Sequence, residues 1–305
     1  MPMGLLDDVR TQAAATANSA RFVTIDASAI DAYAQSLPLA QASAARLDPA
    51  THYAGEPEAT QAYVMTLDAI NFGSGYFPHL KKRSGMSGYF TVASSLRDYF
   101  EIHGPPTVDD LQRLTIWDCA RIFGQTLEGQ AVAELMGLFA RALNDLGKFL
   151  EVCHEGSFRQ MVEAADQSAE RLAEDLTQMP FYRDVGFYKR AQLTAADLSL
   201  ARVGEFNDLA RLTIFADNLV PHVLRMDGVL RYDASLLERI DREELIPAES
   251  PEEQEIRACA LHAVELLRQH VEPVNSMQLD YILWNRGQAR AYKARPRHRT
   301  RTVFY

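Results

Sequence analysis

Long hydrophobic runs are missing from this sequence of 305 residues. No apolar stretch approaches the roughly 20 residues that a membrane-spanning helix requires, so we expect no contact with a membrane. The first ten residues, MPMGLLDDVR, are acidic and lack the apolar centre of a secretory signal. These features predict a cytoplasmic protein.

Cysteine is scarce, and its three positions, Cys119, Cys153 and Cys259, stand singly within helical patterns. Such spacing fits neither a disulfide framework nor a zinc site. The eight histidines show no paired ligand spacing either. The sequence therefore predicts a protein of the reducing cytosol with no metal and no cofactor.

Positive charge is also in short supply, since 31 Lys and Arg residues face 41 Asp and Glu residues and the net charge is −10. Affinity for nucleic acid depends largely on phosphate neutralisation, so we expect no stable nucleic-acid partner. A small anionic ligand remains compatible with a local basic pocket. Residues 293–301 form the one dense basic segment, and the apolar residues after it suit docking.

Alternation typical of strands is weak throughout, and only residues 184–188 and 302–305 suggest short extended pieces. Helical spacing of apolar residues prevails instead, for example over residues 130–150 and 158–176. We expect an all-α fold, a single compact multi-helical domain over residues 1–305. Residues 1–50 would form an outer helical layer.

Asp217 is the acid that least fits a solvated surface, because LTIFA precedes it and Leu-Val-Pro follows Asn218. Pro221 disfavours helical backbone at the residue before it, so the pattern predicts one helix ending near Asp217 and another beginning near Pro221. Asp217 then either caps the second helix or has a chemical task. Asp280 poses a similar question, because Trp284 lies one helical turn further on the same face. Asp280 and Trp284 together could hold a planar polar ligand, or Asp280 could face solvent while Trp284 packs in the core.

Five blocks in register resemble one known family. They are FYKRAQ (187–192), GEFNDLARLTIFADNLVPHVLR (204–225), EIRACALHAVELLR (255–268), LDYILW (279–284) and the terminal HRT…FY (298–305). This set is similar to the queuosine salvage proteins, and the likeness spans about residues 52–305. The resemblance implies hydrolysis of the N-glycosidic bond of queuosine 5'-phosphate, with release of the base queuine. It also implies a fold similar to the all-helical DNA glycosylases.

Glycoside cleavage passes through an oxocarbenium-like state, and a carboxylate beside the sugar stabilises that charge. The resemblance points to Asp217, Asp280 and Lys189 as catalytic residues, and either acid could act at the sugar. Lys189 could hold the phosphate or tune a carboxylate. The residues expected to bind substrate are His52, Asn71, Asp197, Glu205, Phe206, Asp208, Trp284, His298 and Arg299.

One departure from the family concerns residues 73–75, which are Gly-Ser-Gly where relatives carry aromatics. Phe72, Tyr76 or Phe77 are the candidates to replace a stacking residue there. Two other functions fit the same residues: a base-flipping nucleic-acid glycosylase and a queuine-binding protein without catalysis. The net charge of −10 argues against the nucleic-acid glycosylase. Only a measurement of turnover distinguishes the queuine-binding protein from an enzyme.

Overall fold

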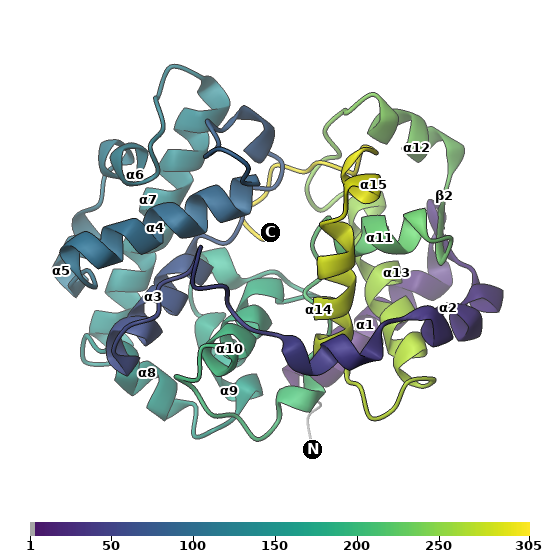
Figure 1. The fold of residues 1–305 in the computed structure, drawn as a ribbon, viewed down its shortest axis with the longest axis horizontal. Coiled ribbons are helices and arrows are strands. Elements are labelled where there is room, and N and C mark those ends of the chain that lie inside the picture. The colour runs from purple at the N-terminus through teal and green to yellow at the C-terminus, as the bar shows by residue number, and fades with distance from the viewer. Residues whose placement is uncertain (1–3) are drawn as a thin grey trace.

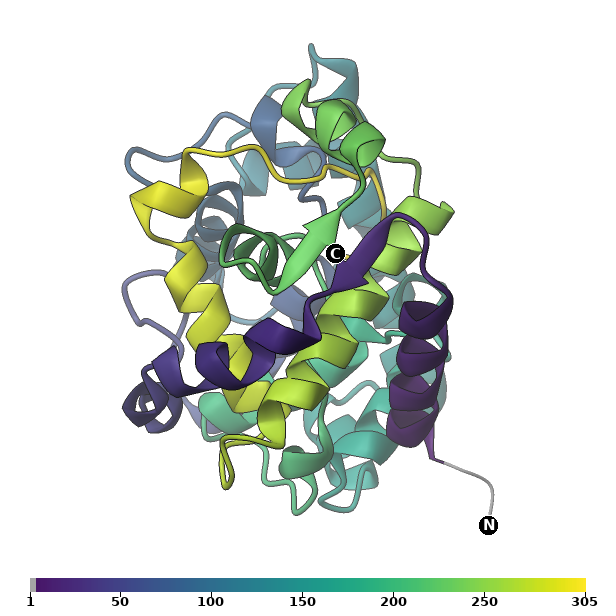
Figure 2. The ribbon, with the colours of Figure 1, turned by 90° about the vertical axis from the view of Figure 1, so that its right-hand side faces the viewer.

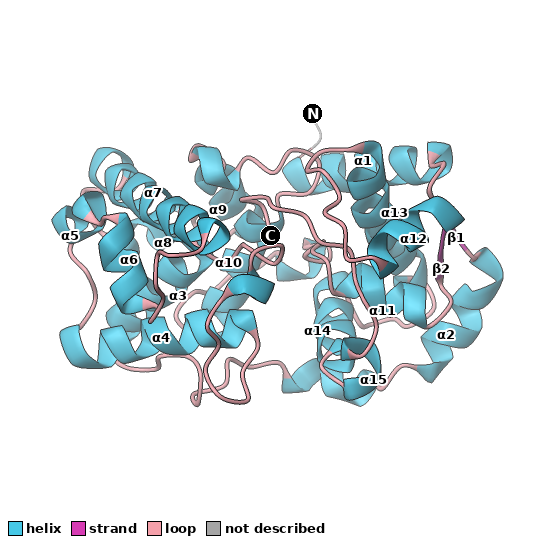
Figure 3. Cartoon of the chain, turned by 90° about the horizontal axis from the view of Figure 1, so that it is seen from above, coloured by secondary structure: helices cyan, strands magenta, loops and turns pink. Residues whose placement is uncertain are grey.

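The computed structural model describes residues 4–305, so Met1, Pro2 and Met3 of the expected outer layer lie outside the described residues. The described chain is mainly helical, as the sequence predicts, and Figure 3 shows helices throughout with two short strands at one end. Those strands are β1 (Val23–Ile25) and β2 (Leu230–Tyr232), which pair antiparallel with Val23 opposite Tyr232. Figure 2 shows the two strands side by side.

The helices of the first part of the chain are α1 (Leu5–Ser19), α2 (Ile30–Ser36), α3 (Pro57–Ala69), α4 (Gly88–His103), α5 (Val108–Arg113), α6 (Ile116–Ile122), α7 (Gln130–Cys153), α8 (Phe158–Ala164) and α9 (Ala169–Leu176). The remaining helices are α10 (Lys189–Leu200), α11 (Val220–Met226), α12 (Ala234–Asp241), α13 (Pro251–Arg268), α14 (Ser276–Gly287) and α15 (Arg290–Lys293). Several begin at a side chain that caps the helix. Thr107 and Asp110 form a capping box at α5, and Asp233 caps α12.

Two hydrophobic cores lie side by side. The first core gathers helices α3 to α10 around the long helix α7, and the second gathers α1, α2 and α11 to α14 around α13. Figure 1 shows these groups as the two halves of the ribbon, with the C-terminus between them. Apolar residues at helical spacing explain why α7 and α13 lie at the centres of the two cores. In α7, Leu135, Phe139, Leu143 and Leu150 are at most 2% exposed.

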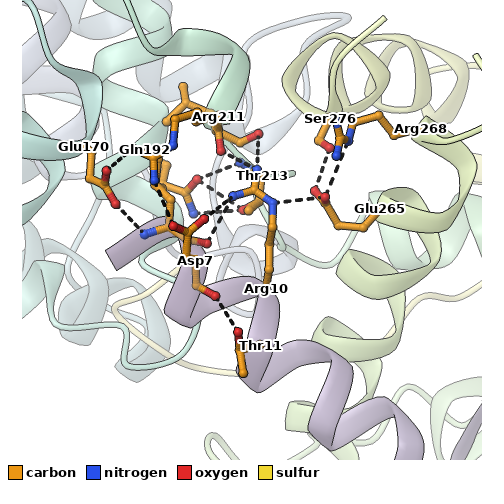
Figure 4. Close-up of polar contacts among 12 residues, drawn as sticks. Asp7, Arg10, Thr11, Glu170, Gln192, Arg211, Thr213, Glu265, Arg268 and Ser276 are labelled. Carbon is orange, nitrogen blue, oxygen red and sulfur yellow. Dashed lines mark hydrogen bonds and ion pairs between the residues drawn. The ribbon is translucent and has the colours of Figure 1, made fainter. Parts of the chain in front are cut away.

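Polar side chains join the two cores along α1 (Figure 4). Nε of Arg10 donates to Glu265 of α13 at 3.0 Å, and the same guanidinium donates to the carbonyl oxygen of Arg211. Arg211 in turn pairs with Glu170 of α9. The loop that follows residue 211 is therefore held from both sides, and this loop leads into the candidate site.

The prediction of a helix ending near Asp217 is wrong. Helix α10 ends at Leu200, and residues 212–219 form a largely buried segment that is neither helix nor strand. Side chains from elsewhere satisfy its backbone: Gln192 accepts the N–H of Thr213 at 2.9 Å. A buried loop needs such partners because its polar groups lose water. The second half of the prediction is confirmed, since α11 begins at Val220 with Pro221 in its first turn.

The extended piece predicted at 184–188 is wrong as well, and the piece predicted at 302–305 forms no strand. The first is a tight turn, in which the N–H of Tyr188 donates to the carbonyl of Asp184 at 2.7 Å. The second docks without forming a strand. The N–H of Gly73 donates to the main-chain oxygen of Tyr305 at 3.0 Å and holds it in place. The real strands were missed because three residues each are too few to show alternation.

Helical spacing over residues 158–176 belongs to two helices, α8 and α9, and not to one. Asp166 and Gln167 between them have φ angles of 48° and 57°, in the left-handed region that breaks a right-handed helix.

Candidate active site

Four aspartates converge where the two cores meet. Asp68 comes from α3, Asp197 from α10 and Asp280 from α14, while Asp217 stands three residues before α11. The first three are at most 6% exposed, and Asp217 is partly buried. We call these four residues the acid cluster. Carboxylates are costly to bury without partners or a task, so the acid cluster is the candidate functional site.

Lys189 is the cation that the acid cluster surrounds. It opens α10 and is 6% exposed, and its Nζ donates to the carbonyl oxygen of Asn71 at 3.5 Å. Burial lowers the pKa of Lys189 below its usual value, while Asp217, Asp68 and Asp280 act in the opposite direction. The sequence-predicted residues Lys189, Asn71, Asp197, Asp217 and Asp280 are thus brought together.

Asp280 is part of the acid cluster and also accepts a hydrogen bond from the main chain. Its Oδ1 accepts the main-chain N–H of Phe215 at 2.9 Å. Burial, with the nearby charge of Asp217, raises the pKa of Asp280 well above its ordinary value. For Asp197 the causes are burial and the charge of Asp68, and the pKa is again raised well above the usual range. Both acids therefore favour the neutral, proton-carrying form.

Asp68 was missed by the sequence analysis. It is fully buried, and Nδ2 of Asn71 donates to its Oδ1 at 3.3 Å. Burial raises the pKa of Asp68 to about 7. A signal was present, because this acid stands inside the apolar helical run QAYVMTLDAINF, three residues before Asn71.

Asp217 occupies a different environment. Its Oδ1 accepts the N–H groups of Leu219 at 2.7 Å and Val220 at 3.2 Å. Lys189 and Arg297 are the cations whose charges interact with it. The predicted capping contact with the start of α11 is present, and the chain around Asp217 leaves it partly accessible.

The segment before Asp217 is tied directly to α10 (Figure 4). Nε2 of Gln192 donates to Oγ1 of Thr213 at 2.9 Å, and the amide oxygen of Gln192 accepts the Thr213 N–H. All of these atoms are buried. The helix that carries Lys189 and the loop that carries Asp217 are therefore held in one arrangement.

Aromatic side chains line the same region. Trp284, on α14, meets Tyr89 and Phe90 of α4 edge to face, with ring centroids 6.1 and 5.8 Å apart. Burial, followed by the charges of Asp197 and Asp68, raises the pKa of Tyr89 well above its usual value. Tyr89 and Phe90 were not predicted, because nothing in a single helix shows which distant helix it will face.

His52 reaches this region through Tyr89. Its Nε2 lies 2.9 Å from the Tyr89 hydroxyl, while its Nδ1 lies 3.1 Å from the carbonyl oxygen of Asp48. Burial lowers the pKa of His52, which favours the neutral ring. The structure thus places His52 where it orients the Tyr89 hydroxyl.

Three other predicted substrate-binding residues, Glu205, Phe206 and Asp208, follow α10. Asp208 accepts the hydroxyl of Ser168 at 2.7 Å and the N–H of Ala169 at 2.6 Å, so it caps α9. Glu205 is exposed on the loop after α10. Phe206 is buried within the first core. The hydrogen bonds of Asp208 to Ser168 and Ala169 are structural, and the spacing of apolar residues in the sequence could not reveal them.

Two of the three candidates for stacking near residues 73–75 are committed elsewhere. Phe72 is 1% exposed and packs against Phe139, with ring centroids 5.3 Å apart. Tyr76 is 3% exposed and donates its hydroxyl to Glu134 at 2.8 Å. Phe77 is only partly buried and packs against the first core.

The basic C-terminal segment docks between the cores, as predicted. His298 is 1% exposed, and burial beside Arg257 and Arg297 lowers its pKa to about 3. Arg299 forms a two-pronged ion pair with Glu243, at 2.7 and 3.1 Å. Of the two arginines, Arg297 is the one whose charge interacts with Asp217.

No group of His, Cys, Asp and Glu residues within residues 4–305 has the arrangement of a metal site. Over the same residues, no helix is both long and apolar enough to span a membrane. Cys119, Cys153 and Cys259 are free thiols.

The family described as Queuosine salvage protein matches residues 51–305. Three relatives are named queuosine 5'-phosphate N-glycosylase/hydrolase. The protein from Sphaerobacter thermophilus is 36% identical over 94% of both chains. That from Dictyostelium discoideum is 31% identical over 81% of this chain and 79% of its own. The Bos taurus protein is 35% identical over 54% of this chain and 56% of its own. With a match that covers the acid cluster, Lys189 and the docked C-terminus, the chain belongs to the queuosine salvage protein family.

Proposed function

We propose that this chain hydrolyses the N-glycosidic bond of queuosine 5'-phosphate and releases queuine. One observation carries the proposal: four aspartates from three helices and a loop surround one buried lysine inside the region that matches the family. The bond breaks through a state with positive charge on the sugar. A site rich in carboxylates stabilises that charge.

Asp217 is the carboxylate assigned to the sugar. It is the partly accessible member of the cluster, and two backbone N–H groups fix the direction of its Oδ1. Preorganised charge of this kind stabilises a transition state because little reorganisation is needed during the reaction. Lys189 lies among the acids and balances their charge.

Asp197 and Asp280 are assigned to the leaving base. Their raised pKa favours the protonated carboxyl, which has both a donor and an acceptor oxygen. The guanine-like edge of the base presents N–H donors, so carboxyl oxygens are suitable partners. Trp284, at the border of this region, offers an aromatic face to a planar base.

The testing experiment is incubation of the protein with queuosine 5'-phosphate, followed by mass spectrometry. We expect free queuine and ribose 5-phosphate in equal amounts. Asp217→Asn serves as the matched control, because it keeps the side-chain shape. If the protein binds queuine tightly but releases none from queuosine 5'-phosphate, it is a queuine-binding protein and not a hydrolase.

A second measurement separates the mononucleotide from nucleic acid as substrate. The net charge of −10 repels a polyanion, so we expect turnover of the mononucleotide far above that of intact tRNA. Comparable rates at physiological salt would favour the base-flipping glycosylase. The cytoplasmic location, the single-domain organisation and the absence of a cofactor remain predictions.

A further inference from the structure

We propose that Arg257 is the positioning residue that holds the segments of Lys189 and Asp217 in register across the junction of the two cores. This inference rests on the proposed function. Arg257 lies on α13 and is 1% exposed, so it acts through other residues and does not touch the substrate. Its guanidinium is engaged on two edges and on two faces.

One edge of the guanidinium holds the turn that precedes Lys189. Nη1 donates to Oδ1 of Asp184 at 2.9 Å, and Nη2 pairs with Oδ2. The same Oδ2 accepts the main-chain N–H of Lys189 at 3.2 Å. A two-pronged arginine–carboxylate pair fixes orientation as well as distance. The backbone position of Lys189 therefore follows from that of Arg257.

This turn needs a firm anchor because its backbone is unusual. Tyr188, the residue before Lys189, has φ 47° and ψ 41°, in the left-handed region that side-chain-bearing residues rarely adopt. Such a conformation is unfavourable for a residue with a side chain and persists only where surrounding contacts determine it. Here the N–H of Tyr188 and the N–H of Lys189 both donate to Asp184.

The other edge of the guanidinium holds the segment of Asp217. Nε of Arg257 donates to the carbonyl oxygen of Ala216 at 2.8 Å. Ala216 directly precedes Asp217, so the peptide that carries this acid is bonded to the same side chain that anchors Lys189. Both donors belong to one rigid planar group. A change in either segment is therefore transmitted to the other.

Two aromatic rings hold the guanidinium on its faces. Its central carbon lies 3.9 Å from the ring centroid of Phe187 and 4.7 Å from that of Tyr305. Burial disfavours the charge, but Asp184 and Glu253 outweigh it and raise the pKa of Arg257. Tyr305 belongs to the docked C-terminal segment. The C-terminus thereby contributes to the same support.

A lysine at position 257 tests this role, because it keeps the charge and loses the planar fork. We expect Arg257→Lys to lower kcat roughly 10- to 100-fold, the scale of a small misplacement of reacting groups, with KM within about threefold of wild type. The control is Arg286→Lys. Arg286 also forms an ion pair, with Asp227, and lies near two aromatic rings, but it is outside the acid cluster. Arg286→Lys should leave kcat within about twofold of wild type.

The decisive measurement is a double-variant cycle with Asp217→Asn. If Arg257 acts through Asp217, the double variant turns over about as fast as Asp217→Asn alone, because coupled changes are not additive. A full additional loss would show that Arg257 does not act through Asp217 and would overturn the positioning role alone. Normal kcat in Asp217→Asn would overturn both this inference and the assigned catalytic residue. A wild-type protein that releases no queuine would defeat the proposed function itself.

Tyr305→Leu provides a second variant if Arg257→Lys does not fold. It removes one aromatic face and leaves the hydrogen bonds of Arg257 to Asp184 and Ala216 in place. We expect a loss of about three- to tenfold in kcat at unchanged KM, again absent in the Asp217→Asn background. Unchanged kcat in a folded Tyr305→Leu protein, or an additive loss, would overturn the proposal.

Discussion

Oδ1 of Asp280 accepts the main-chain N–H of Phe215 at 2.9 Å, two residues before Asp217. The two acids nominated for chemistry are therefore linked, since one of them fixes the chain that presents the other. Replacing Asp280 by alanine would remove a possible reacting group and release the loop at once. Asparagine avoids this confusion, because its amide oxygen can still accept the Phe215 N–H.

Asp217→Asn should lower turnover by about 10²-fold or more, the scale for loss of one preorganised electrostatic group. The fold should persist, because an amide oxygen can accept the N–H groups of Leu219 and Val220 that Asp217 now accepts. Queuine affinity should change little. Measured kcat, queuine binding and thermal melting check this together. A folded variant with near-normal kcat would leave Asp217 as a cap and pass the role to Asp280.

Asp68 should make the free energy of unfolding depend on pH. Its pKa is about 7 in the folded protein, against 3.8 for an unperturbed aspartate. Between those values the folded state keeps a proton that the unfolded state releases, so stability falls as pH rises from about 4 to about 7. Asp68→Asn removes this contribution.

The measurement is thermal melting of wild type and Asp68→Asn at several pH values across this window. The fall in melting temperature with rising pH should be smaller in the variant. It should not vanish, because Asp197 also has a raised pKa and remains present. Parallel pH curves for the two proteins would contradict the raised pKa of Asp68.

The sequence allowed part of this site to be predicted, and the reason is local. Pro221 marks the start of α11, and an acid in an apolar run stands out without any partner in view. The helix expected before Asp217 does not form, because Gln192 and Arg257 supply hydrogen bonds that an isolated segment would need to make itself. Such partners are distant in sequence. For the same reason the sequence did not show that Asp68 of α3 joins the acid cluster.

Asp208 shows the opposite error. Its place among apolar residues resembles that of Asp217, yet its carboxylate caps α9 through the N–H of Ala169. Sequence periodicity identifies acids that cannot be freely solvated. It does not tell a structural hydrogen bond from a chemical task, because the two differ only in what tertiary structure places opposite them.

His52 and Tyr89 should act as one unit. Nε2 of His52 lies 2.9 Å from the Tyr89 hydroxyl. Loss of His52 should therefore disturb the orientation of that hydroxyl, and Tyr89→Phe removes it. We expect His52→Ala and Tyr89→Phe each to raise KM for queuosine 5'-phosphate several-fold. The double variant should be no worse than the more affected single variant. Steady-state kinetics of the three proteins test this, and losses that multiply would mean that His52 acts independently of Tyr89.

Arg297 is the arginine that we assign to the 5'-phosphate. The sequence predicted that His298 and Arg299 bind substrate, but burial lowers the pKa of His298 to about 3, and Arg299 is paired with Glu243. A neutral histidine lacks the charge that a phosphate favours. Arg297 is partly exposed, and its charge interacts with Asp217 at the acid cluster.

Arg297→Ala should raise KM for queuosine 5'-phosphate roughly 10- to 100-fold, the scale of a charge-assisted hydrogen bond of about 1.5–3 kcal/mol. Hydrolysis of the dephosphorylated nucleoside should be nearly unchanged, because it lacks the group that Arg297 binds. Arg299→Ala is the matched control and should affect neither substrate by more than about twofold. Kinetics of the two variants on both substrates provide the measurement. Equal losses on nucleotide and nucleoside would give Arg297 a structural role, and a selective loss in Arg299→Ala would move the phosphate site to that residue.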